Sequence, residues 1–230
     1  MKKIVVLTGA GISQESGLKT FRDDGGLWKE HRFEELATPE AWLRDMDLVL
    51  EFYNWRRKQM YEVKPNPAHL ALVKLEEKYD VQIITQNVDD LHERAGSKNI
   101  LHLHGELGKA RSTVDESLIY DIEGWELKKG DCCEKGSQLR PHIVWFGEAV
   151  SNIVPAMQIS GTADIFLVIG TSLIVYPAAG LINYVPEESI KYLVDPSAKP
   201  TGHVSNLNTI REKAGVGVPH LVKQLLNEAD

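Results

Sequence analysis

The sequence predicts an α/β fold, in which a Rossmann-type, doubly wound parallel sheet carries a second, smaller lobe formed by two insertions. Short apolar runs alternate with helical patterns along the chain, which is the order of elements in a parallel sheet. Polar or glycine-containing turns follow these runs, at the strand ends where open α/β sheets bind ligands. Two longer stretches break the alternation, and we assign them to the smaller lobe.

The strands are expected at short, continuous apolar runs, because a parallel strand is buried on both faces. Three runs fit this description best: Ile4–Leu7, Val81–Thr85 and Ile165–Ile169. Two further candidates for the same sheet are Ile190–Val194 and the short Ile100–Leu103.

Helical patterns lie between the strands. Asn66 and Pro67 are typical N-cap and first-turn residues, and they predict a helix that runs towards Tyr79. A strong helical pattern covers Asp47–Tyr61. The last helix is expected at Pro219–Ala229, which carries its leucines and valine on one face.

The two insertions differ in character. Gly17–Lys64 contains helical patterns but no strand, whereas Glu106–Pro141 is polar and poor in core residues. We therefore expect three parts: a Rossmann-type large domain of residues 1–17, 66–104 and 142–230, a helical insertion of residues 18–65, and a small-lobe insertion of residues 105–141.

The composition is that of a globular protein in a reducing compartment. The 230 residues are 43% hydrophobic and 26% charged, with a net charge of −7, which argues against nucleic acid or an anionic membrane as the main partner. No apolar stretch approaches the roughly 20 residues that span a bilayer. The only cysteines, Cys132 and Cys133, are adjacent, which argues against a disulfide framework. We expect a cytoplasmic protein.

The first turn, in "VVLTGAGISQESGLKTF", only partly matches a dinucleotide-binding fingerprint. Gly9 and Gly11 would let the backbone approach a pyrophosphate at a helix N-terminus. Gln14 stands where the third glycine belongs, and the acidic residue that reads a ribose about 20 residues later is absent. By itself this pattern fits either a nucleotide site or a plain tight turn.

Three later turns bring further polar groups to strand ends. Gln86, Asn87 and Asp89 could hold a ribose or a carboxamide, although Asn87 and Asp89 could equally cap a helix. His104 precedes Gly105 at a strand end and is a candidate general base, with a structural histidine as the alternative. The run Gly170-Thr171-Ser172 offers a second turn for a phosphate or ribose.

Taken together, six segments resemble the sirtuins, the NAD-dependent protein deacylases, and among them the class III members of bacteria. They occur in the order of the family: "GAGIS" (9–13), "FRDDGGLW" (21–28), "TQNVDDLHERAG" (85–96), "HLHGEL" (102–107), "RPHIVWFGE" (140–148) and "GTSLIVYPAAG" (170–180).

The resemblance implies that the large domain binds NAD, which is consumed as a co-substrate, in the cleft beside the small lobe. It implies roles for the turn that holds the pyrophosphate, the cofactor loop, the nicotinamide pocket and the adenosine side. The cofactor-binding residues carried over are Gly9, Ala10, Gly11, Ile12, Ser13, Glu15, Phe21, Arg22, Trp28, Gln86, Asn87, Val88, Asp89, His104, Gly170, Thr171, Ser172, Asp195, Pro196 and Ala214.

The resemblance also implies the chemistry. His104 would act as the base on the ribose hydroxyls, with Asn87 and Asp89 beside it, and the acyl group of a modified lysine would pass to the ribose. The products would be lysine, nicotinamide and 2′-O-acyl-ADP-ribose. The segment Val144, Trp145, Phe146 and Gly147 would pair with the backbone of the acylated protein as an added strand.

The acyl group can be inferred from three residues. Ala37, Tyr53 and Arg56 fall at the spacing of the class III sirtuins, which resemble a desuccinylase, demalonylase and deglutarylase more than a pure deacetylase. Tyr53 and Arg56 lie three residues apart and so share a helix face. There an arginine can bind a terminal carboxylate through two hydrogen bonds, and the tyrosine hydroxyl can add a third. The alternative is an amphipathic helix whose Arg56 and Arg57 face solvent.

Two departures from the family concern the small lobe and the adenine side. Most sirtuins bind a structural zinc through two CxxC pairs, but here the first region reads "GKARSTVDESL" and the second has only the adjacent Cys132 and Cys133. Since a closed zinc site needs four ligands, we predict no zinc. The stretch "YLVDPS" differs from the family and puts the adenine contacts of Leu193–Asp195 in doubt.

Three functions follow from these observations. A deacylase that favours succinyl, malonyl and glutaryl groups is expected first. The alternatives are an NAD-dependent ADP-ribosyltransferase on the same scaffold and a non-catalytic sensor of NAD or ADP-ribose. We expect a monomer.

Overall fold

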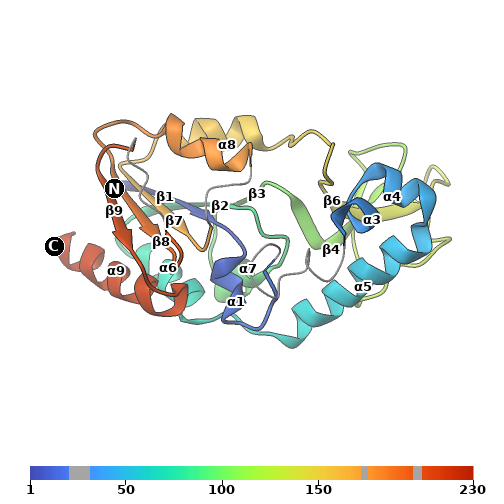
Figure 1. Ribbon diagram of the computed structural model, residues 1–230, viewed down its shortest axis with the longest axis horizontal. Coiled ribbons are helices and arrows are strands. Elements are labelled where there is room, and N and C mark those ends of the chain that lie inside the picture. The colour runs from blue at the N-terminus through green and yellow to red at the C-terminus, as the bar shows by residue number, and fades with distance from the viewer. Residues whose placement is uncertain (21–31, 172–175, 199–203, 230) are drawn as a thin grey trace.

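The computed structural model describes residues 1–20, 32–171, 176–198 and 204–229. The chain forms two lobes, with a larger sheet and its helices on one side and a smaller sheet beside helices on the other (Figure 1). Both chain ends belong to the larger lobe, so the smaller one is built from internal segments.

The large lobe contains a six-stranded parallel sheet in the order β3-β2-β1-β7-β8-β9. Five of its strands confirm the predicted apolar runs, whereas β9 was missed because it is a polar edge strand with no apolar run. The strands are β1 (Lys3–Thr8), β2 (Asp80–Thr85), β3 (Ile100–His102), β7 (Ile165–Ile169), β8 (Ile190–Val194) and β9 (Leu207–Ile210).

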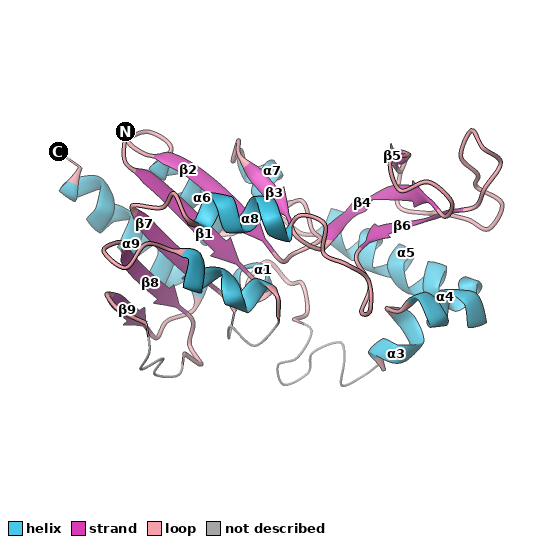
Figure 2. Ribbon diagram, turned by 90° about the horizontal axis from the view of Figure 1, so that it is seen from above, coloured by secondary structure: helices cyan, strands magenta, loops and turns pink. Residues whose placement is uncertain are grey.

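Helices cover both faces of this sheet, as a doubly wound fold requires (Figure 2). One face packs on α6 (Pro67–Leu75) and α9 (Ala214–Glu228), and the other on α8 (Ile153–Ser160) and the 3₁₀ helix η1 (Ala178–Tyr184). Two short helices follow β1 and β2 at the edge that carries the site, α1 (Gly11–Gln14) and α7 (Leu91–Ala95). No helix in the described ranges is long and apolar enough to cross a membrane.

The predicted start of α6 is correct, although the helix ends at Leu75 and does not reach Tyr79, whereas the predicted start of α9 is wrong. The Asn66 side chain accepts from the N–H of Ala68, and His69 completes a capping box by accepting from the N–H of Asn66. In α9, Pro219 lies inside the helix instead of beginning it, and the helix starts at Ala214. The buried Ala214 and Val218 pack the first turn into the core, and this packing offsets the hydrogen bond that Pro219 cannot make.

The small lobe combines an antiparallel sheet with three helices. The sheet has the order β5-β4-β6, and its core contains aromatic and aliphatic side chains from both layers. Its elements are α3 (Phe33–Leu36), α4 (Pro39–Arg44), α5 (Met46–Glu62), β4 (Gly105–Ser112), β5 (Ile119–Asp121) and β6 (Leu139–Ile143). The predicted limits of the three parts of the chain stay a prediction.

Hydrogen bonds and an ion pair connect the outer part of the small lobe, where both cysteines lie. Cys133 is buried and its thiol donates to the Ser112 hydroxyl over 3.3 Å, while Cys132 is exposed. An ion pair of 2.7 Å joins Lys135 to Asp115. The described residues contain no group of three or more histidine, cysteine or acidic side chains placed to hold a metal ion.

Candidate active site

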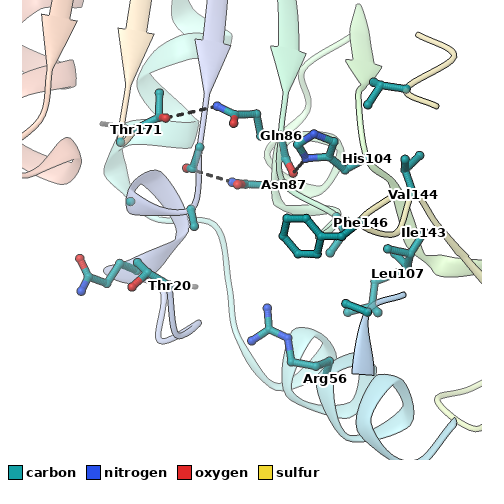
Figure 3. Close-up of a pocket in the computed structure, with 18 of the residues that line it drawn as sticks. Thr20, Arg56, Gln86, Asn87, His104, Leu107, Ile143, Val144, Phe146 and Thr171 are labelled. Carbon is teal, nitrogen blue, oxygen red and sulfur yellow. Dashed lines mark hydrogen bonds between the residues drawn. The ribbon is translucent and has the colours of Figure 1, made fainter. Parts of the chain in front are cut away.

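A cavity of about 790 Å³ opens at the carboxyl ends of β1, β2, β7 and β8 and extends to the small lobe. Figure 3 shows residues of both lobes facing this space, with Gln86, Asn87 and Thr171 on one side and Arg56 on the other. The volume is in the range of pockets that enclose ligands the size of a drug or larger. The cavity therefore has room for a dinucleotide or a substrate side chain at the edge predicted from the sequence.

The glycine turn after β1 lies directly against the turn after β7. The N–H of Gly9 donates to the Ile169 carbonyl over 3.0 Å, and the N–H of Gly11 donates to the Gly170 carbonyl over 2.8 Å. A Cβ atom on Gly11 would lie 2.7 Å from the Gly170 Cα. The close approach that requires glycine is thus between two turns of the protein, and it fixes the floor of the cavity.

Amide side chains hold the turn after β2 to this floor. Asn87 donates through Nδ2 to the Gly9 carbonyl and the Ser13 hydroxyl, both over 3.2 Å. Gln86 donates to the Thr171 hydroxyl over 3.3 Å, so the turns after β1, β2 and β7 are joined. Asn87 does not cap α7, which excludes that alternative for its side chain.

Asp89 does make a capping contact, because its carboxylate accepts from the N–H of Leu91 over 3.2 Å. The side chain is buried and lies behind the cavity lining. Burial raises the pKa of Asp89 above its ordinary value, against the opposing effects of the Leu91 N–H, the Ser13 hydroxyl and the Arg56 charge. Asp89 is therefore placed to act on the site through Ser13 and Arg56.

His104 is placed as a base by the hydrogen bond of its other nitrogen. Its Nδ1 lies 3.0 Å from the Gln86 carbonyl, which can only accept, so Nδ1 carries the proton. In the neutral ring Nε2 is then the nitrogen that can accept a proton, and the residue lines the cavity (Figure 3). His102, by contrast, is buried and bonds the Glu93 carboxylate over 2.7 Å.

The α5 helix brings Tyr53 and Arg56 to the opposite wall, beside Ala37. Their exposed fractions are 5% for Tyr53 and 6% for Arg56. Burial lowers the pKa of Arg56, while the charge of Asp89 and the phenol of Tyr53 raise it. Arg57 is also fully buried and donates to the Leu107 and Trp125 carbonyls. The alternative in which Arg56 and Arg57 face solvent is therefore wrong.

The segment Val144–Gly147 connects the two lobes along the cavity. The N–H of Val144 donates to the His104 carbonyl and that of Phe146 to the Ala37 carbonyl, each over 2.9 Å. These bonds place one side of the segment beside His104 and the other beside Ala37, the smallest of the three predicted acyl-site residues.

The far end of the cavity, beyond β8, is lined by Asp195, Pro196 and Ala214. Glu15 ties this end to the glycine turn, because its carboxylate accepts from the N–H of Gly215 over 2.6 Å. Asp195 reaches the lining although its surroundings depart from the family pattern, whereas Leu193 lies in the buried part of β8.

Most of the predicted site residues meet in this one cavity. Of those in the described residues, Ile12, Ser13 and Asp89 lie behind the lining rather than in it. Phe21, Arg22, Trp28 and Ser172 lie outside the described residues. The other lining residues were not singled out from the sequence, although several lie in the segments that resemble the family: Gln14, Thr20, Phe52, Leu107, Ile143, Glu148, Val150, Tyr176, Pro177, Ser197 and Lys213.

Known proteins resemble this chain along nearly its whole length. An NAD-dependent protein deacylase from Bacteroides thetaiotaomicron is 54% identical over 231 residues, which cover 98% of this chain and 98% of the relative. A protein of the same name from Helicobacter pylori is 50% identical over 229 residues and covers all of both chains.

Solved structures also resemble this chain along nearly its whole length. A Sir2 homologue in complex with NAD is 40% identical, with a TM-score of 0.89 over 100% of this chain and 91% of that one. A Sir2 homologue mutant in complex with 2′-O-acetyl-ADP-ribose is 39% identical, also with a TM-score of 0.89, over 100% and 94% of the two chains. The sequence profile of the Sir2 family matches residues 9–177. The chain belongs to the Sir2 family.

Proposed function

We propose that this protein is an NAD-dependent deacylase of protein lysines that favours succinyl, malonyl and glutaryl groups over acetyl. Its family and the name of its relatives support the deacylase activity. The acidic preference depends on one observation: Tyr53 and Arg56 are buried, yet both line the cavity that His104 lines from the other side.

A buried guanidinium in a cavity favours an anionic ligand. Arg56 is buried, and a carboxylate at the end of an acyl chain could form charged hydrogen bonds with the planar guanidinium group. An acetyl group ends in a methyl and offers no such acceptor. Ala37, on the same wall, leaves room for the longer chain.

The lining fits NAD as co-substrate. Gly9, Gln86 and Thr171 line the floor, Asp195 and Ala214 line the far end, and His104 faces the middle of the cavity. When bound, NAD supplies the ribose that accepts the acyl group. His104 Nε2 would take a proton from a ribose hydroxyl, and Asn87 would keep the turn after β2 fixed to Gly9. We propose nicotinamide and 2′-O-acyl-ADP-ribose as products.

The test compares kcat/KM on succinyl-lysine and acetyl-lysine versions of one peptide, read as nicotinamide release. Arg56→Met should lower the succinyl value roughly 100-fold and the acetyl value far less, because two charge-assisted hydrogen bonds are lost. Lys58→Met is the matched control: it removes a charge from the same helix, at a residue that stacks on Trp125 outside the cavity. It should leave the ratio of the two values unchanged.

Two results would contradict the proposal. A wild-type enzyme active on acetyl-lysine alone, and unaffected by Arg56→Met, would disprove the acidic preference. His104→Ala should lower both activities by about 100-fold or more, and retention of full activity would contradict the assignment of the base. With radiolabelled NAD the label should appear in a small ester; label left on protein would instead indicate an ADP-ribosyltransferase.

A further inference from the structure

The Tyr53 hydroxyl, one of the two groups proposed to bind the acyl carboxylate, has a neighbour that restricts its role. The indole Nε1 of Trp145 lies 3.1 Å from the Tyr53 oxygen. An indole N–H can only donate, so the Tyr53 oxygen is the acceptor of this bond. The proton of Tyr53 must then point away from Trp145, and within the described residues it has no recorded acceptor.

The indole is held firmly from several sides. The Arg140 guanidinium carbon lies 3.2 Å from the centre of its ring, and the Trp42 ring packs nearby with centroids 5.8 Å apart. The backbone N–H of Trp145 donates to the Glu148 carboxylate over 2.8 Å. With an exposed fraction of 2%, Trp145 has little space in which to turn.

Charges extend this support into the small sheet. Arg140, from β6, donates to both oxygens of Glu148, over 2.6 and 3.1 Å. Arg111, from β4, donates to the same carboxylate, with both distances at 3.2 Å. Glu148 thus lies between two buried arginines. It holds Trp145 in two ways: it accepts from the backbone N–H of Trp145, and it binds the Arg140 side chain that stacks on the Trp145 ring.

Tyr53 remains a neutral donor in these surroundings. Burial raises the pKa of its phenol far above the ordinary value, and the Trp145 hydrogen bond, Arg140 and Arg56 oppose that rise without cancelling it. The phenol is therefore neutral near pH 7 and can present its proton to an acceptor in the cavity.

We propose that Trp145 is a specificity-determining residue, which directs the Tyr53 proton into the acyl end of the cavity by occupying the acceptor side of the Tyr53 oxygen. A terminal carboxylate can accept that proton, whereas the methyl of an acetyl group cannot. Trp145 acts through Tyr53 and so is a positioning residue for selectivity. This inference rests on the proposed function, since it concerns how the same site recognises an acidic acyl group.

The test measures the ratio of kcat/KM for succinyl-lysine to that for acetyl-lysine, first in three single variants. Trp145→Phe keeps an aromatic ring but removes the N–H, and should lower the ratio roughly five-fold. Tyr53→Phe should lower it roughly ten-fold, as expected for one hydrogen bond to a charged group. Trp42→Phe is the matched control, because it trims the ring that packs on Trp145 and keeps the Trp145 N–H. It should leave the ratio unchanged.

The double variant gives the decisive comparison. In the Tyr53→Phe background, Trp145→Phe should cause no further fall in the ratio, because the hydroxyl through which it acts is already gone. Replacement of Trp145 by benzothienylalanine, which has sulfur in place of the N–H and nearly the same shape, should reproduce the fall without a loss of packing.

Several outcomes would overturn the inference while the proposed function stands. In the first, the wild type prefers succinyl-lysine and Arg56→Met removes that preference, but neither Trp145 variant changes the ratio of kcat/KM for succinyl-lysine to that for acetyl-lysine. Equal falls in the Trp42→Phe and Trp145→Phe variants would show a packing effect only. A wild type without any succinyl preference would instead contradict the proposed function itself.

Discussion

Gly105 stands immediately after the proposed base, and its backbone shows how tightly a single position can be constrained. Its φ is +83°, in the left-handed region, and a Cβ there would lie 2.0 Å from the His142 carbonyl oxygen. Any other residue here would therefore combine backbone strain with a steric clash, at the point where β3 passes into β4 and where His104 leaves the sheet.

We predict that Gly105→Ala lowers the free energy of unfolding by several kcal/mol more than Gly124→Ala does. Gly124 also has a left-handed φ, of +76°, but nothing lies within 4 Å of its Cβ position, so its substitution costs only the backbone strain of about 1–2 kcal/mol. Urea unfolding of both variants measures the difference. If both variants lost the same free energy of unfolding, the backbone at His142 would have to move away from the new Cβ atom without an energetic cost.

At the scale of residues, the type of a side chain was predictable and its burial was not. The spacing of Tyr53 and Arg56 on one helix face followed from the sequence. Whether that face met solvent or a cavity depended on β4 and β6, whose pairing involves residues far along the chain. The contact of Trp145 with Tyr53 spans 92 positions and left no local signal.

Among the elements, α6 and α7 bring two buried histidines together beneath the site. The rings of His69 and His92 lie 5.0 Å apart, and His92 bonds the Thr8 hydroxyl of β1 over 3.0 Å. Burial lowers the pKa of His69 to about 4, although the charge of Glu93 raises it somewhat. Burial also holds the pKa of His92 well below its ordinary value, and the neighbouring His69 and His102 act in the same direction.

These shifts predict an acid-sensitive fold. The unfolded chain binds protons at His69 near pH 6.5, but the folded chain does so only near pH 4, so stability rises with pH through this window and is fully present above it. His69→Gln should reduce the change in unfolding free energy between pH 4 and 7 by up to roughly 3 kcal/mol, because glutamine can keep the capping box without titrating. Urea unfolding from pH 4 to 7 measures this slope.

The exposed His220→Gln is the control for this series and should leave the slope as in the wild type. His102 makes the opposite contribution to the dependence of stability on pH. Burial lowers its pKa, but the hydrogen bond and charge of Glu93 outweigh burial and leave the pKa raised, so its stabilisation is lost as pH rises through that value. A wild-type stability independent of pH between 4 and 6.5 would contradict the burial of neutral histidines.

The elements that could be predicted are those whose pattern is local. Five apolar runs became strands of the large sheet, and the Asn66–Pro67 pair marked the start of α6 correctly. The edge strand β9 and the small sheet carry polar sequences, because each meets solvent on at least one side. Their pairing partners, rather than their own composition, make them strands.

At the scale of the whole molecule, the small lobe is expected to be stable without a metal. Its outer part is joined by the Cys133–Ser112 bond, by the Lys135–Asp115 ion pair and by backbone bonds such as that from the Leu139 N–H to the Asp131 carbonyl. The presence of a second, smaller lobe and a site at the strand ends could be predicted from the sequence, whereas the contribution of the small lobe to that site was implied by the family resemblance alone.

We therefore predict that a zinc chelator changes neither the deacylation rate nor the melting temperature, and that the purified protein holds much less than one zinc per chain. Elemental analysis and a melting curve with and without the chelator measure this. A zinc-containing member of the family, treated in parallel, should lose stability. One bound zinc per chain, whose removal lowers the melting temperature, would disprove the prediction.

The contact between the turns after β1 and β7 also bears on how this protein can diverge. Gly9 and Gly11 meet Gly170 so closely that a side chain at any of the three would push into the backbone opposite. A second substitution at the same contact cannot compensate for the first, since glycine has nothing left to remove. We therefore expect all three positions to remain glycine as the sequence changes. The neighbouring Gln14 shows that the rest of the turn can depart from the dinucleotide fingerprint.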